Sequence, residues 1–215
     1  TNLFNYRELL FNLAKKELKV KYKNSVLGFF WSLLNPILMM LIFSFVLGVV
    51  FKDQKIDNFP IFFLAGLLPW NFFNNSIQGA TGSIVANAGL IKKVYFPREL
   101  LPFSIALANL VNFFLELVVF FLFISASAWF FTPRLAVFYR FIPYLIILLP
   151  ALFLFSVGIG LITAAINVYL RDVQHLIGII LMVLFYATPI IYRLELVPPA
   201  FLPFYKYNHL AVLII

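Results

Sequence analysis

The stretch Val26–Phe51, VLGFFWSLLNPILMMLIFSFVLGVVF, decides the fold class of this chain. It contains no charged residue, and it exceeds the roughly 20 apolar residues that a helix needs to cross a bilayer. Four further blocks of similar length and composition follow it. We therefore expect five complete transmembrane helices, at 26–51, 59–85, 100–131, 141–167 and 176–192. The short alternating segments of a membrane β-barrel are missing, so the sequence predicts an all-α, polytopic helical bundle.

The overall composition agrees with a membrane protein. The 215 residues are 64% hydrophobic, 19% aromatic and only 11% charged, whereas soluble domains are about 45–50% apolar and about 25% charged. A soluble enzyme, a disordered linker and a disulfide-stapled module are therefore excluded. The net charge of +8 does not indicate nucleic acid, because the basic residues lie between apolar blocks and form no basic face on a soluble body.

The distribution of Lys and Arg predicts the orientation in the membrane. Segments on the side of the N-terminus, at 1–25, 86–99 and 168–175, carry 10 of these residues, and the opposite segments carry 6. Because cytoplasmic loops are enriched in Lys and Arg, we expect a cytoplasmic N-terminus. Both ends of the sequence look trimmed, and we expect residues 210–215 to begin a sixth span.

Residues 1–24 are expected to form an amphipathic helix at the membrane interface, ahead of a transmembrane domain at 25–215. Basic and polar side chains fall in one arc of this helix, opposite a face rich in leucine. Such a helix suits the boundary between headgroups and acyl chains. Two roles remain open, a topology anchor or a lever that moves beside the first span. The candidate lever residues are Lys15, Lys16, Lys19 and Lys23.

Polar or small residues recur on one face of three expected spans, where lipid contact alone would favour Leu, Ile, Val and Phe. These residues are Asn71, Asn74, Asn75 and Gln78 in the second span, Asn109, Asn112 and Glu116 in the third, and Ser156, Gly160, Thr163 and Asn167 in the fourth. We expect the fourth-span stripe to pack against another helix, with Gly158 and Gly160 permitting close approach. For the amides of the second span, both interpretations remain possible: packing against another helix, or lining a water-filled path.

A transport path would also use aromatic rings, on which sugars stack, although packing within the bundle explains such rings equally well. We expect Glu116 to be protonated, paired or capped by amides such as Asn112, with pairing favoured, because an unpaired carboxylate in the bilayer is unfavourable. Four prolines, Pro36, Pro69, Pro150 and Pro189, are expected to interrupt the spans. The candidate path residues are Trp31, Asn35, Asn71, Asn74, Asn75, Gln78, Glu116 and Tyr186.

The sequence contains no phosphate-binding loop of the Gly-x-x-x-x-Gly-Lys-[Ser/Thr] type and no Cys. Its two histidines, His175 and His209, lie in segments expected on opposite sides of the membrane. We therefore expect no metal site, no catalytic residues and no cofactor in this chain. Energy for movement against a gradient would come from a partner or from an ion.

Two stretches resemble one family, the ABC-2-type permeases that export lipid-linked polysaccharide. They are Leu13–Pro36, LAKKELKVKYKNSVLGFFWSLLNP, and Asn167–Asp172, NVYLRD, followed by Ile180–Tyr192, ILMVLFYATPIIY. The resemblance implies half of a homodimeric channel with six spans, in a bacterial cytoplasmic membrane. It also implies a separate cytoplasmic ATPase dimer that holds ATP and Mg²⁺. The implied substrates are O-antigen, teichoic-acid or capsule glycans, commonly carried on undecaprenyl diphosphate.

The same resemblance implies roles for particular segments. Residues 3–24 match the gate helix, and 193–209 match external re-entrant helices. The loop 86–99 matches the contact with the ATPase, and the candidate coupling residues are Lys92, Lys93, Arg98, Arg171 and Asp172. One departure is His209, which stands where the family usually has Pro. The alternatives are an ABC-2 permease for drugs or lipids, an ion-coupled transporter, and a membrane enzyme acting on lipid-linked sugars.

Overall fold

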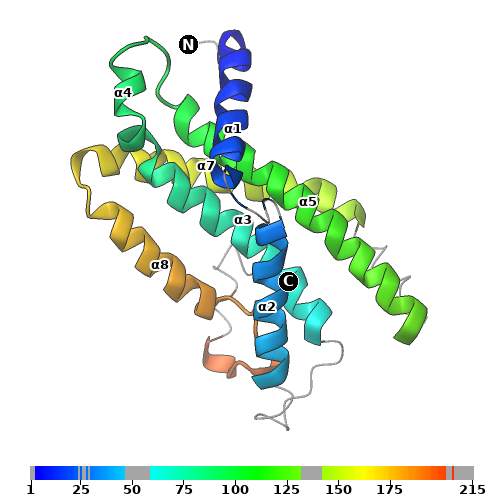
Figure 1. The fold of residues 1–215 in the computed structure, drawn as a ribbon. Helices are drawn as coiled ribbons and strands as arrows, with labels where there is room; N and C mark the ends of the chain where they lie inside the picture. The colour runs from blue at the N-terminus through cyan, green and yellow to red at the C-terminus, as the bar shows by residue number, and fades with distance from the viewer. Residues whose placement is uncertain are drawn as a thin grey trace. The chain divides into compact units, whose positions relative to one another are not determined.

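A computed structural model describes residues 3–23, 25, 28, 30–46, 59–131, 142–201 and 205. Every regular element in these ranges is a helix, and none of the described residues forms a β-strand (Figure 1). The expected all-α class is therefore confirmed for this part of the chain. The expected sixth span at 210–215 and the loops at 52–58 and 132–140 lie outside the described residues.

The chain divides into two compact units. Unit 1 comprises Thr1–Gly28, Phe72–Phe113 and Leu149–Leu181, and unit 2 comprises Phe29–Asn71, Phe114–Leu148 and Met182–Ile215. The long helices each contribute one part of their length to each unit. The packing of each unit is therefore described separately.

The long apolar blocks form helices close to the predicted bounds. The N-terminal segment forms the 3₁₀ turn η1 (Leu3–Tyr6) and helix α1 (Arg7–Tyr22). The next helices are α2 (Phe30–Phe45), α3 (Phe59–Ala86), the short α4 (Ala88–Ile91), α5 (Leu100–Phe131) and α7 (Ile142–Tyr169). The ends of the first expected span, at 26–29 and 47–51, lie largely outside the described residues.

The fifth expected span is shorter than the sequence indicated. Helix α8 covers Val173–Ala187, whereas the prediction extended to residue 192. Pro189 explains the difference, because proline lacks a backbone donor and disfavours the helical conformation of the preceding Thr188. Two 3₁₀ turns follow, η3 (Leu194–Leu196) and η4 (Pro199–Phe201). The remainder of the expected re-entrant segment lies outside the described residues, apart from Tyr205.

Three of the four prolines expected to interrupt the spans lie inside helices, and whether they kink these helices stays a prediction. Pro36, Pro69 and Pro150 lie inside α2, α3 and α7, and each helix continues through its proline. Within a membrane, a helix tolerates proline where neighbouring groups satisfy the freed carbonyls. Only Pro189 marks the end of a helix.

Two helices are long and apolar enough to cross a membrane by themselves, with candidate spans at Leu100–Ser125 and Leu145–Tyr169. Two shorter apolar helices, Phe30–Phe45 and Val173–Ala187, accompany them. Helix α3 is as long as α7 but is less apolar, because it carries the amides at 71, 74, 75 and 78. The described residues therefore support a membrane protein, and five complete spans remain a prediction.

Helices α3 and α7 pack closely in unit 1, as the fourth-span stripe predicted. The Thr81 hydroxyl lies 2.8 Å from the Thr163 hydroxyl, and Asn167 Nδ2 donates to the Thr81 carbonyl at 2.9 Å. A Cβ placed on Gly160 would lie 2.8 Å from Ala80 Cβ. A Cβ placed on Gly158 would meet no described atom within 4 Å, so this second glycine has no part in the close packing of the described residues.

Aromatic side chains fill the described part of unit 2. The rings of Phe43 and Phe63 have centroids 5.1 Å apart, and those of Trp70 and Phe185 are 5.6 Å apart. Phe63 and Trp70 of α3 are both buried. These contacts connect α3 with α2 and with the end of α8.

Candidate functional site

Helix α1 is docked on the segment that joins α3 to α5. Leu13 of α1 forms a buried apolar cluster with Phe96, Leu100 and Leu101. Further side chains pack against this cluster, namely Tyr6, Leu9, Leu10, Leu90 and Ile91. Burial of one leucine stabilises a contact by about 1.5–3 kcal/mol, so the cluster holds α1 firmly against residues 90–101.

The course of α1 differs from that expected of a helix lying along the membrane surface. Leu13 contacts Leu101 near the start of α5, and the Tyr22 hydroxyl donates to Asn112 Oδ1 at 2.9 Å. Asn112 lies about 16 Å further along α5 than Leu101, at 1.5 Å per helical residue. The C-terminal end of α1 therefore reaches the middle of the candidate span Leu100–Ser125. Leu9, Leu10 and Leu13 face protein here, where the prediction placed acyl chains.

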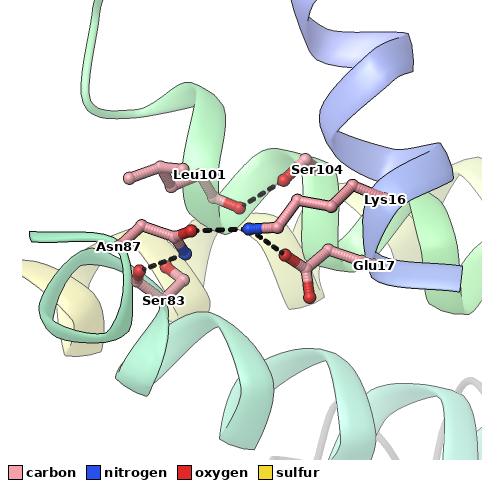
Figure 2. A network of polar contacts seen from close by, with 6 residues as sticks. All are labelled: Lys16, Glu17, Ser83, Asn87, Leu101 and Ser104. Atoms are coloured by element: carbon pink, nitrogen blue, oxygen red, sulfur yellow. Dashed lines mark hydrogen bonds and ion pairs between the residues drawn. The ribbon is translucent and has the colours of Figure 1, made fainter. Parts of the chain in front are cut away.

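A polar network fixes the register of α1 against the loop (Figure 2). The Lys16 ammonium donates to Asn87 Oδ1 at 2.8 Å and lies 3.5 Å from the Glu17 carboxylate. Asn87 Nδ2 in turn donates to the Ser83 carbonyl of α3 at 2.9 Å. Because Lys16 is half exposed, we expect these contacts to add under about 1 kcal/mol. The Lys16–Asn87 and Asn87–Ser83 hydrogen bonds therefore align α1 with the end of α3.

The Tyr22–Asn112 contact is only partly satisfied. Asn112 is 4% exposed, and its Nδ2 has no hydrogen-bond partner among the described residues. A net gain of about 1 kcal/mol from one hydrogen bond is set against about 1–3 kcal/mol for a buried donor left unpaired. Rotating the amide would exchange the two atoms and still leave one without a partner. The contact is therefore close to energetic balance.

Among the described residues, the side chains of the other predicted lever residues form no hydrogen bond or ion pair with another element. Lys15, Lys19 and Lys23 are exposed. Of the four lysines in that prediction, Lys16 alone is brought to the Asn87 network. Their role in a moving helix stays a prediction.

The predicted coupling residues all lie in unit 1 and are all exposed. Lys92, Lys93 and Arg98 belong to the connection between α3 and α5, and Arg171 and Asp172 belong to the connection between α7 and α8. The two connections lie at one end of unit 1, because Asn167 and Gln174, which flank the second, contact α3 at Thr81 and Gly82. Asp172 also precedes α8, where a carboxylate is favoured by the helix dipole.

Exposed apolar residues accompany these charges. Tyr95 is 97% exposed and Tyr169 is 86% exposed, and Val94 and Leu170 beside them are more than half exposed. An aromatic and apolar centre next to basic side chains is typical of a protein-binding surface. We call Lys92–Arg98 and Tyr169–Asp172 the contact surface.

The amides of α3 form a row at i, i+3, i+4 and i+7. Asn75 and Gln78 are exposed, and Asn71 and Asn74 are partly buried. Gln78 Nε2 donates to Asn74 Oδ1 at 3.0 Å along the same helix, so the row does not bond across to a neighbouring helix through this pair. The opposite side of α3 is apolar and buried, with Phe73 and Ile77 each 1% exposed.

The remaining predicted path residues belong to unit 2, as does Asn71. Trp31, Asn35 and Tyr186 are exposed, whereas Glu116 is buried and has an interaction partner. Which group pairs with Glu116 stays a prediction. A path that combines these residues with Asn74, Asn75 and Gln78 of unit 1 stays a prediction.

Sequence reasoning did not identify Tyr22 or Asn87 as important. Asn87 precedes Ala88-Gly89, a pattern typical of a turn, and its bond to Lys16 bridges residues far apart in the chain. Tyr22 lies in a run of lysines, which concealed its contact with α5. The described residues contain no group of three or more acidic, His or Cys side chains able to hold a metal ion.

Comparison with known proteins identifies similar sequences over nearly the whole chain. The model of the ABC-2 type transporter family matches residues 8–214. An O-antigen export system permease protein RfbA of Myxococcus xanthus is 38% identical over 198 residues, covering 90% of this chain and 71% of the relative.

Two further relatives are similar. An RfbA of Klebsiella pneumoniae is 34% identical over 216 residues, covering 100% of this chain and 80% of the relative. A polysialic acid transport protein KpsM of Escherichia coli is 26% identical over 199 residues, covering 92% of this chain and 75% of the relative.

Proposed function

The chain belongs to the ABC-2 type transporter family, and on this basis we propose that it is the membrane-spanning permease subunit of an ABC exporter that moves polysaccharide across the bacterial cytoplasmic membrane. The observation that carries this proposal is the similarity to O-antigen export permeases at 38% and 34% identity. The KpsM relative supports the broader class of surface polysaccharides. The chain is a transport subunit and not an enzyme.

The energy for export comes from a separate ATPase. The sequence contains no phosphate-binding loop of its own, and ATP and Mg²⁺ are held by the partner. The contact surface supports this assignment, since its exposed tyrosines and basic side chains suit a soluble protein partner. In this arrangement the contact surface and the N-terminus face the cytoplasm, as the distribution of Lys and Arg predicts.

Two copies of the chain enclose the path. Exposed amides such as Asn75 and Gln78 are unfavourable against acyl chains, so the row on α3 faces water or a second copy. One subunit with five or six spans is too narrow to surround a hydrated glycan. A homodimer with the amide rows facing inward provides water and weak, repeated hydrogen bonds along which a polymer slides.

The substrate is a lipid-linked glycan of the O-antigen type, or a teichoic-acid or capsule glycan of related chemistry. The family match alone fits an ABC-2 permease for drugs or lipids equally well. The relatives named above favour polysaccharide over these classes. An ion-coupled transporter or a membrane enzyme has no supporting observation among the described residues.

Co-purification and reconstitution test the proposal. We expect the tagged permease to co-purify with an ATPase subunit from its own cell. In vesicles that contain both proteins, lipid-linked O-antigen glycan should raise ATP hydrolysis several-fold and appear in the lumen when ATP is added outside. Stimulation and transport of a drug or a free lipid, with no response to the glycan, would instead identify the alternative ABC-2 class.

A further inference from the structure

The Tyr22–Asn112 contact is built differently from the rest of the α1 docking site. The N-terminal half of α1 is held by a buried apolar cluster around Leu13. The C-terminal end is held by the hydroxyl of Tyr22, which donates to Asn112 Oδ1 at 2.9 Å. Asn112 is buried, and its Nδ2 has no partner among the described residues. The two ends of α1 are therefore fixed with different strength.

The backbone beyond the C-terminal end of α1 leaves the helical conformation. Lys23 ends the helix in an extended conformation, with φ −64° and ψ 132°. Gly28 adopts φ +48°, which favours glycine, and its backbone N–H donates to Ser25 Oγ at 3.0 Å. Lys23 and Gly28 therefore both depart from helical geometry after the end of α1.

From these observations we infer that Asn112 is a positioning residue, which holds the end of α1 through Tyr22 as a latch that opens and closes. In the docked state one amide atom of Asn112 is buried without a partner. When the end of α1 moves away, water reaches both the amide and the Tyr22 hydroxyl and satisfies them. This contact therefore adds little free energy to the docked state, and a push from a partner shifts the population. The role in transport rests on the proposed function, whereas the latch itself does not.

Two substitutions should shift the latch in opposite directions. Tyr22→Phe removes the hydroxyl and leaves the buried amide of Asn112 without this partner, so we expect the released population to rise about fivefold or more. Tyr22→Phe combined with Asn112→Leu replaces both polar groups by apolar groups of similar size. Such paired replacement is nearly neutral or stabilising, so we expect the released population to fall below that of the unmodified chain.

Distance measurements between spin labels read this population directly. The chain contains no Cys, so labels at Val20→Cys and Val111→Cys report only the separation of α1 from α5; both positions are exposed and lie near the latch. Mixing with unlabelled chain removes distances between copies. Tyr6→Phe in the preceding turn η1 is the matched control, because it also removes only a hydroxyl, and it should leave the distances unchanged. If Tyr22→Phe and the double variant both leave the distances unchanged, the pair is a static packing contact and the inference is overturned.

Transport provides the second readout. In vesicles with the ATPase and lipid-linked O-antigen glycan, the double variant should export at least fivefold more slowly while its thermal stability is equal or higher. A purely structural contact would instead leave export unchanged, because the paired replacement is nearly neutral for stability. Shifted distances with unchanged export would overturn the role of the latch in transport. Absence of export by the unmodified chain would contradict the proposed function and leave the distance result standing.

Discussion

Replacing Lys92 and Lys93 together by glutamate is expected to stop ATP-driven export while leaving the permease folded. Both side chains are exposed on the contact surface, and the connection that carries them also packs on α1 through Phe96. Reversing the charge places acidic groups where the proposed partner meets basic ones, and such like-charge contacts are unfavourable by several kcal/mol. We expect export to fall by on the order of tenfold or more, as measured by glycan accumulation in vesicles containing the ATPase.

The stability of the double variant distinguishes loss of contact from loss of fold. Lys92 caps the short helix α4, where a basic residue is favoured by roughly 0.5 kcal/mol, so the melting temperature should change little. The export rate of the variant with both Lys92→Gln and Lys93→Gln should lie between those of the unmodified chain and the glutamate variant. The glutamines remove the attraction to the partner without adding repulsion. Export by the glutamate variant at the unmodified rate would show that this loop does not contact the ATPase.

Gly160→Leu is expected to destabilise unit 1 strongly. A Cβ at this position would lie 2.8 Å from Ala80 Cβ, and alanine has no flexible end that could move aside. The substitution therefore separates α7 from α3 and strains the bonds of Thr163 and Asn167 to Thr81. We expect a loss of about 3 kcal/mol in the free energy of unfolding. This loss corresponds to a melting temperature lower by roughly 6–12 °C for a chain of this length.

The same helix provides the matched control. Gly158 is exposed and has no neighbour within 4 Å, so Gly158→Leu should leave the melting temperature of the purified subunit unchanged. Thermal unfolding of both variants in one detergent compares them directly. Equal melting temperatures for the two variants would mean that α3 and α7 are not in close contact at residue 160.

Hydrophobic blocks and helical spacing predicted much of the fold. The bounds of α3, α5 and α7 agree with the expected spans to within two residues, because long apolar runs with few alternatives form helices. The stripe Gly160, Thr163 and Asn167 correctly indicated a packed face. The prediction that Gly158 also lies at a close helix contact was not met. A glycine in a helix permits close approach without requiring it, and only the tertiary structure determines which glycine has a neighbour.

The site was less predictable than the fold. The leucines of α1 indicated an apolar face, but periodicity cannot distinguish acyl chains from Phe96 and Leu101 as the contact. The Lys16–Asn87 and Tyr22–Asn112 bonds join residues more than 70 positions apart, and local patterns carry no information on such pairs. The prolines inside α2, α3 and α7 lie within continuous helices, and the sequence alone does not show which groups satisfy the carbonyls that they free.

Aqueous accessibility of the α3 amide row tests the central claim, that this row lines a hydrated path. Single cysteines at Asn71, Asn74 and Gln78, in a chain that otherwise lacks Cys, should react with a charged, membrane-impermeant thiol reagent in at least one nucleotide state of the assembled exporter. Ile77→Cys on the buried face and Val118→Cys on an exposed apolar face of α5 should not react. If all three row positions stay unreactive in every nucleotide state, the row faces protein or lipid, and the proposed path does not exist.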